Sequence, residues 1–236
     1  MTQELFRMDS YLATCTARIA AIGEEGLELD RTVFYPTGGG QPGDRGTLTL
    51  DDGHVLNVAD TRKTDDGRIL HLLSGPVTNV AVGQRVTGAI DWERRYRLMR
   101  VHTCLHLLCA VIPEAVTGGS IRDDGTGRLD FNIPEPTLDK EALTARLNEL
   151  VASDSPVKPC WITDDELAAQ PELVRTMSVQ PPSGTGKVRL LEIDGIDLQP
   201  CGGTHVSSTG EIGPVRISKI EKKGRQNRRV NIALES

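Results

Sequence analysis

The sequence predicts an α+β protein, with a small N-terminal antiparallel β-barrel followed by a two-layer α+β domain that contains an antiparallel sheet. Residues 1–91 contain short alternating apolar runs separated by glycine and aspartate turns, whereas residues 92–236 combine amphipathic helices with further alternating runs. A chain of 236 residues can form two such domains. We therefore predict a barrel-like domain over 1–91 and a second domain over 92–236.

The barrel strands are predicted from five apolar alternations. They span residues 16–22, 46–50, 54–60, 68–73 and 84–90. The sequence "DDG" occurs twice between these runs, at 51–53 and 65–67. Because Asp-Gly favours tight turns, we expect the strands to be antiparallel.

The second domain opens with a predicted amphipathic helix that begins near Trp92 and ends at Pro113. Its apolar residues recur at spacings of three and four, at Leu98, Val101, Leu105, Leu108 and Ile112. The spacing of Thr163 and Glu166 predicts a capping box at the start of a short helix, which Pro171 must shorten or kink. A further helix is expected over 138–152, and strands over 127–133, 187–194, 214–221 and 229–235.

The composition is that of a globular protein with an aliphatic core. Hydrophobic residues make up 38% of the chain and charged residues 25%, but aromatic residues only 3%. No segment has the character of a membrane span or a secretory signal, so we expect a cytoplasmic protein with no membrane partner. Five scattered cysteines lack the spacing of a disulfide framework and indicate reduced thiols or metal ligands.

Two pairs of potential metal ligands lie far apart in the sequence. One pair is four residues apart on the first predicted helix, so both imidazoles leave the same face of that helix. The other pair consists of the first and last residues of the sequence "CGGTH" at 201–205. Imidazole and thiolate are ligands that zinc favours, so the pattern predicts one zinc ion per chain. The four predicted ligands are His102, His106, Cys201 and His205.

The role of that metal is left open by the sequence. Four ligands fill a tetrahedron, as in a structural site, whereas a reaction needs an open position for water or substrate. Gly202 and Gly203 permit a sharp backbone path between the two ligands of "CGGTH" and a close approach to the backbone. The remaining histidines, His54 and His71, have no assigned role.

Two glycine-containing segments resemble nucleotide-binding motifs but lack their context. Residues 38–43 match a dinucleotide fingerprint, yet a strand follows where that motif needs a helix. Residues 183–187 resemble a phosphate loop, but Pro181 and Val188 occupy positions that the loop needs for other residues. We expect no nucleotide triphosphate ligand. The loop at 34–46, "FYPTGGGQPGDRG", is either a tight barrel turn or a wall that lets backbone amides approach a ligand.

The charge is unevenly distributed, although the formal net charge is -6. Acidic residues predominate over 123–172, whereas basic residues cluster over 216–229, around the predicted hairpin loop "EKKGRQNRR". Arg94, Arg95, Arg97 and Arg100 lead into the helix that carries the histidine pair. These runs are either solvated surface or contacts to successive phosphates of a nucleic acid.

Three motifs together resemble the editing domain of alanyl-tRNA synthetase and the free-standing alanyl-tRNA editing proteins. They are "FYPTGGGQPGDRG" at 34–46, "HTCLH" at 102–106 and "CGGTHVSSTGEIGPVRI" at 201–217. The resemblance covers nearly the whole chain. It implies zinc-dependent hydrolysis, in trans, of Ser-tRNA(Ala) and by extension Gly-tRNA(Ala), with zinc held by the four predicted ligands.

The resemblance and the charge pattern together give a set of expected substrate-binding residues. The partner is mischarged tRNA(Ala), bound through its acceptor end, and we expect a monomer or weak dimer. The family attributes selection of serine to a polar residue beside the pocket, whose place here falls on Thr117. The expected contacts are Gly38, Gly39, Gly40, Gln41, Gly202, Gly203, Arg94, Arg100, Lys222, Lys223, Arg228 and Arg229.

Three alternatives remain. Editing of Ser-tRNA(Thr) relies on the same style of metal motif, although the glycine-rich N-terminal segment favours the alanine system. An RNA-binding module with a purely structural zinc would bind tRNA but cleave no ester. A metallohydrolase of small molecules would have no need of the basic hairpin.

Overall fold

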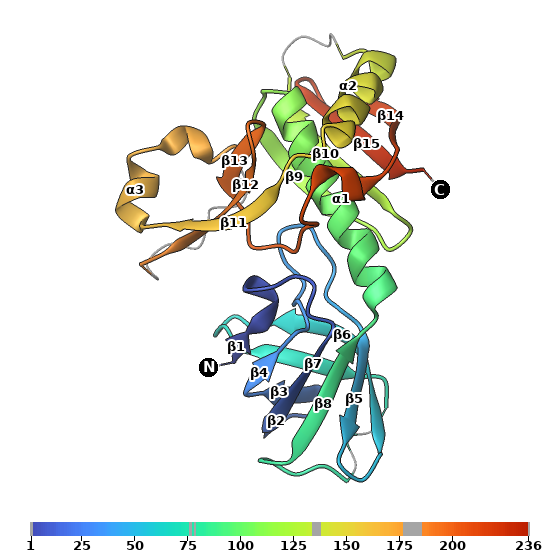
Figure 1. Cartoon of the computed structure of the whole chain (residues 1–236), viewed down its shortest axis with the longest axis vertical. Coiled ribbons are helices and arrows are strands. Elements are labelled where there is room, and N and C mark those ends of the chain that lie inside the picture. Colours follow the sequence, from blue (N-terminus) through green and yellow to red (C-terminus); the bar gives the residue numbers. More distant parts are fainter. Residues whose placement is uncertain (1, 76, 78, 134–137, 177–185, 236) are drawn as a thin grey trace. The chain divides into compact units, whose positions relative to one another are not determined.

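The computed structural model describes residues 2–75, 77, 79–133, 138–176 and 186–235. It divides into two compact units, Met1–Tyr96 and Arg97–Ser236, and this boundary falls within the long helix α1 (Trp92–Val111). The fold class is confirmed, because an antiparallel barrel precedes a region of helices and antiparallel sheets (Figure 1). The predicted assignment of separate roles to residues 1–91 and 92–236 stays a prediction.

The first unit is a closed barrel of six strands in the order β2-β3-β7-β6-β5-β8, with every neighbouring pair antiparallel. Its core is mainly aliphatic, with Ile19, Leu27, Leu48 and Val86 all fully buried or nearly so. The strands are β2 (Thr14–Ile22), β3 (Gly26–Leu29), β5 (Gly46–Leu50), β6 (Val55–Lys63), β7 (Ile69–Leu73) and β8 (Arg85–Ile90). Five of them coincide with the predicted alternations, and β3 was missed because four residues are too few to show a period.

Short elements complete the first unit. Strand β1 (Gln3–Glu4) pairs in parallel with β4 (Arg31–Thr32), and η1 (Leu5–Arg7) is a single turn of 3₁₀ helix. These elements lie beside the barrel at its N-terminal strand (Figure 1).

The larger sheet of the second unit has the strand order β14-β15-β10-β9 and is antiparallel throughout. Helices α1 and α2 (Lys140–Ala152) pack on it (Figure 1). A Cβ at Gly127 would lie 2.6 Å from Val101 Cγ1, so this glycine lets α1 approach the sheet closely. The strands are β9 (Val116–Ile121), β10 (Thr126–Asn132), β14 (Val215–Lys222) and β15 (Asn227–Leu234).

A second sheet of three strands has the order β11-β12-β13. The strands are β11 (Val157–Ile162), β12 (Val188–Ile193) and β13 (Asp197–Pro200). The sequence indicated only β12 of these three. Pro159 weakens the strand pattern of β11, which tolerates it as an edge strand, and β13 is only four residues long.

The predicted helices are observed within one or two residues of their expected ends. The capping box of Thr163 and Glu166 opens α3 (Asp164–Ala168), and Pro171 begins η2 (Pro171–Leu173). A third 3₁₀ helix, η3 (Thr209–Ile212), precedes β14. The rejected phosphate-loop motif lies mostly outside the described residues. Among the described residues, no helix is both long enough and apolar enough to cross a membrane.

Candidate metal centre

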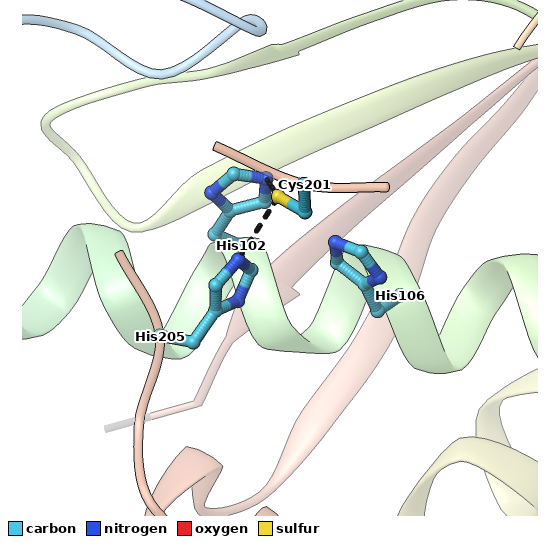
Figure 2. Close-up of side chains that lie close together, drawn as sticks. All are labelled: His102, His106, Cys201 and His205. Carbon is cyan, nitrogen blue, oxygen red and sulfur yellow. Dashed lines mark hydrogen bonds between the residues drawn. The ribbon is translucent and has the colours of Figure 1, made fainter. Parts of the chain in front are cut away.

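Helix α1 presents two imidazoles from one face. His102 and His106 are one turn apart, and their ring centroids lie 5.5 Å from each other. The chain that leaves β13 brings Cys201 and His205 to the same place, where the side chains turn toward the two helical rings (Figure 2). The structure thus brings together the four ligands that the sequence pairs predicted.

The four side chains form a compact cluster that could hold a metal ion. Each offers one ligand atom, and these atoms all lie within 4.8 Å of one another. Cys201 Sγ lies 3.1 Å from His205 Nε2 and 3.6 Å from His102 Nε2 (Figure 2). The three histidines are buried, whereas Cys201 is partly exposed. Among the residues that the structure describes, this is the only such group of three or more histidine, cysteine or acidic side chains.

Thr103 fixes the orientation of His205. Its hydroxyl donates to Met99 O at 3.0 Å and accepts from Val206 N at 3.3 Å. The same oxygen lies 3.2 Å from His205 Nδ1. Because a hydroxyl has one proton, already given to Met99, His205 Nδ1 must be the donor in this contact. The lone pair of His205 is therefore on Nε2, the atom that faces Cys201.

Asp197 fixes His106 in the same way. His106 Nδ1 donates to Asp197 Oδ2 at 3.1 Å, so its Nε2 is left for the cluster. The carboxylate is completely buried, and Gln199 Nε2 donates to the same oxygen at 2.7 Å.

The electrostatics of the cluster favour a thiolate. Burial alone would raise the pKa of Cys201, but the three neighbouring imidazoles bring this pKa well below its ordinary value. Burial acts against a charge on His106 too, yet the negative charges of Cys201 and Asp197 raise the pKa of His106 to about 9. Burial and the other two rings hold the pKa of His205 well below its usual range. The thiolate is the form of cysteine that binds metals.

The "CGGTH" segment is held by a buried arginine. Arg189 on β12 donates to Cys201 O at 2.6 Å and to Gly203 O at 3.3 Å. Gly203 N donates to Cys201 Sγ at 3.4 Å. Neither Gly202 nor Gly203 has a positive φ, so the path of this segment does not depend on the left-handed region. Gly202 is exposed beside the cluster.

The glycine-rich loop of the first unit contains a tight turn. Gly38 and Gln41 exchange backbone hydrogen bonds of 3.1 and 2.9 Å. Gly39 and Gly40 between them have φ values of 55° and 80°, as a type I′ turn requires. Both are exposed, whereas Gln41 is buried. The geometry is that of a tight turn, and its predicted contact with a substrate stays a prediction.

The predicted basic contacts separate into exposed and engaged side chains. Lys222 and Lys223 are exposed at the β14–β15 hairpin, and Lys223 Nζ lies 3.2 Å from Glu221 Oε1. Arg229 makes a two-bond contact with Asp130, at 2.7 and 2.9 Å. Arg100 Nε donates to Ile212 O at 2.8 Å.

Two further arginines of the predicted set are buried and donate to backbone carbonyl groups, and their contact with substrate stays a prediction. Arg94 is buried and donates to Gly43 O at 2.8 Å, so it braces the glycine-rich loop. Arg228 is also buried, and it donates to Gly224 O and Asn227 O within the hairpin. Sequence cannot distinguish such carbonyl-bound arginines from surface ones, because both occur in charged segments.

Thr117, the predicted selector of serine, lies on β9. Its hydroxyl donates to Asp130 O at 3.1 Å and accepts from Asn227 Nδ2 at 3.4 Å. One lone pair of this oxygen remains for another donor.

Three residues that the sequence did not single out complete the centre: Thr103, Arg189 and Asp197. Thr103 carried one usable signal, since it stands inside "HTCLH" next to a predicted ligand. Asp197 and Arg189 carried none, because Asp197 meets His106 across 91 residues and β12 had no predicted link to the cluster.

Two family models match the chain. The model described as "tRNA synthetases class II (A)" matches residues 8–94, and the one described as "Threonyl and Alanyl tRNA synthetase second additional domain" matches residues 188–231. The second match includes Cys201 and His205.

Relatives that match nearly the whole of this chain give a consistent result. The chain is 37% identical to the alanyl-tRNA editing protein AlaX-M of Methanosarcina barkeri, with 99% of each chain covered. It is 35% identical to the protein of the same name from Saccharolobus solfataricus, over 98% of each. It is also 36% identical to an alanine–tRNA ligase of Saccharolobus islandicus, over 94% of this chain and 25% of the ligase.

Proposed function

The chain belongs to the family of alanyl-tRNA editing proteins, and we propose that it hydrolyses the ester bond of tRNA(Ala) that carries the wrong amino acid. The substrates are Ser-tRNA(Ala) and, by the same chemistry, Gly-tRNA(Ala). The observation that supports this most strongly is the cluster of His102, His106, Cys201 and His205, in a chain that matches named editing proteins end to end.

The cluster fits zinc by donor type and by spacing. Zinc with nitrogen and sulfur ligands is usually tetrahedral, and its bond lengths separate neighbouring donors by about 3.5 Å. The two distances from Cys201 Sγ, 3.1 and 3.6 Å, are close to that separation. When bound, zinc would supply a Lewis acid that polarises a carbonyl oxygen and lowers the pKa of water, as ester hydrolysis requires.

Neighbouring residues of the chain orient the ligands of the centre. Thr103 and Asp197 hold His205 and His106 with their Nε2 atoms toward the cluster. Arg189 donates to the carbonyl oxygens of Cys201 and Gly203 in the loop. Cys201 is partly exposed and Gly202 is exposed, and we propose that the tRNA terminus enters from this side.

Selection of serine is proposed to depend on Thr117. Its single proton is donated to Asp130 O, so its remaining lone pair can accept a bond from a serine hydroxyl. Alanine has no such donor, and a site built around a hydroxyl contact discriminates strongly against a substrate that lacks it. In Thr117→Val the ratio of serine to alanine hydrolysis would fall.

The test is a deacylation assay with Ser-tRNA(Ala), Gly-tRNA(Ala), Ala-tRNA(Ala) and Ser-tRNA(Thr). We expect hydrolysis of the first two, and loss of it in His102→Ala and Cys201→Ala. The matched controls are His54→Ala, an exposed histidine, and Cys160→Ala, a partly exposed cysteine outside the cluster. Hydrolysis of Ser-tRNA(Thr) alone would assign the protein to the threonine system, which the description of the 188–231 family model also names.

A structural metal is the second candidate, because four protein ligands can fill a tetrahedron and leave no open position. In that case removal of the metal unfolds the second unit, tRNA still binds to the loaded protein, and no ester is cleaved. Circular dichroism during metal removal, together with the assay above, separates this candidate from the enzyme.

A further inference from the structure

We propose that Asp197 is a positioning residue that sets the metal affinity of the cluster through His106. This inference rests on the proposed function, because it requires the cluster to hold zinc. Asp197 is the first residue of β13 and lies outside the predicted ligand set.

The hydrogen bond to His106 determines which nitrogen is available to a metal. Asp197 Oδ2 accepts from His106 Nδ1 at 3.1 Å, and both side chains are buried. With its proton on Nδ1, the neutral ring has its lone pair on Nε2. A carboxylate in this position also makes the imidazole a stronger donor to a metal.

The carboxylate is itself held in place on two sides. Gln199 Nε2 donates to Oδ2 at 2.7 Å. One guanidinium nitrogen of Arg175 lies 3.6 Å from Asp197 Oδ1. The other terminal nitrogen of Arg175 donates to Cys109 O on α1 at 2.8 Å. Rotation of the carboxylate away from His106 would therefore break contacts with both neighbours.

Burial of this carboxylate is costly to the fold. The side chain of Asp197 is fully buried, yet Oδ1 has no hydrogen-bond partner and only a long ion pair with Arg175. A buried charge with incomplete compensation destabilises a protein relative to an apolar residue of similar size. Orientation of His106 is a function that would account for a buried carboxylate at this position despite its cost in stability.

His205 provides an internal comparison. Its Nδ1 is held by the neutral hydroxyl of Thr103, whereas the Nδ1 of His106 is held by a charge. The two buried imidazoles are thus oriented alike, but only His106 has a negatively charged partner at Nδ1. Removal of the charge from residue 197 should affect metal binding even where the hydrogen bond is kept.

The experiment is a zinc titration of the metal-free full chain against a chromophoric chelator. Asp197→Asn keeps an oxygen that can accept from His106 but loses the charge, and we expect about tenfold weaker zinc binding. Asp197→Ala loses both, and we expect a loss of up to about 100-fold. Asp194→Asn removes the same charge from an exposed residue three positions away, and should bind zinc as the wild type does.

A second measurement needs no variant. Nitrogen-15 NMR of the zinc-loaded wild type should show His106 with a proton on Nδ1 and the metal on Nε2. The opposite arrangement, with zinc on Nδ1, overturns the inference even if the Asp197 variants fail to fold.

The outcomes separate this inference from the function on which it rests. If the wild type binds zinc and the Asp197 variants bind it equally well, or if Asp194→Asn loses as much affinity, the positioning role is wrong and the proposed function stands. A wild type that binds no zinc overturns both.

Discussion

Two buried histidines, His71 in the barrel and His106 in the metal centre, have pKa values that are shifted in opposite directions. Both ring nitrogens of His71 have partners within the first unit, since Nε2 lies 2.8 Å from Thr32 Oγ1 on β4 and Nδ1 lies 3.0 Å from Leu27 O on β3. Burial lowers the pKa of His71 to about 4. His106 has one nitrogen bound to Asp197 and the other directed to the cluster, and its pKa is raised to about 9.

The difference shows that burial alone does not identify a metal ligand. A histidine whose two nitrogens both contact the protein is part of the core, even where it packs edge-on against an aromatic ring as His71 does on Phe34. A histidine with one nitrogen fixed by a hydrogen bond and the other facing a thiolate is oriented to bind a metal ion. Substitution of each histidine and of its hydrogen-bond partner can test whether this distinction determines function.

The largest effect is expected when each histidine is removed in turn. His106→Ala should abolish deacylation and leave the barrel folded, because its ring contacts the cluster and Asp197, both in the second unit. His71→Gln should destabilise the barrel by about 1–3 kcal/mol, through imperfect replacement of two buried hydrogen bonds, and leave zinc binding intact. Zinc content and deacylation rate, measured on the same samples, give the comparison.

The contrast fails if the two variants behave alike. Loss of zinc from His71→Gln, at a temperature where it remains folded, would mean that the barrel histidine contributes to the centre.

The second effect is a pH dependence of barrel stability. The pKa of His71 is about 4 in the folded barrel and ordinarily about 6.5. Above pH 6.5 both states are neutral and the barrel has its full stability. As the pH falls from about 6.5 to 4, the unfolded chain binds a proton that the folded barrel excludes, so stability falls by up to about 3 kcal/mol.

The fluorescence of Trp92 can follow this transition. The chain has two tryptophans, and Trp161→Phe leaves only the one in the first unit. His71→Gln in the same background should lose most of the dependence between pH 6.5 and 4. A slope that persists there would assign the effect to other groups.

The third effect compares the two threonines that hold histidines. Thr103→Val removes the acceptor of His205 Nδ1, so zinc affinity should fall by about tenfold. Thr32→Val removes the partner of His71, and should lower barrel stability without a change in zinc affinity. Chelator competition and urea unfolding measure the two quantities. Equal zinc affinities in Thr103→Val and wild type would contradict the proposed orientation of His205.

The smallest effect is expected at the surface. Lys222→Ala and Lys223→Ala should each raise KM for Ser-tRNA(Ala) a few-fold with kcat unchanged. Each should also reduce the slope of log affinity for tRNA against log salt concentration by about one. Lys158→Ala removes an exposed lysine from β11, outside the hairpin, and serves as the control. An unchanged KM in both hairpin variants would exclude this hairpin from tRNA binding.

The fold and the ligand set could be predicted from sequence where the signal is local. The pair His102 and His106 is visible from helical spacing, and the pair Cys201 and His205 from five consecutive residues. Barrel strands of five or more residues alternate clearly, whereas β3, β9 and β13 are too short or too rich in glycine to do so.

The remainder depends on contacts between distant parts of the chain. Asp197 gains its importance from a residue 91 positions away. The burial of Arg94 and Arg228 follows from packing that sequence does not display, and the same holds for the fully satisfied ring of His71.

The central claim is that the cluster holds a zinc ion on which ester hydrolysis depends. The most direct test is to titrate zinc into the metal-free protein and measure bound zinc and Ser-tRNA(Ala) hydrolysis in the same samples. We predict that the rate rises in proportion to bound zinc and stops rising at one ion per chain. A metal-free protein that hydrolyses the ester as fast as the loaded one would contradict the claim.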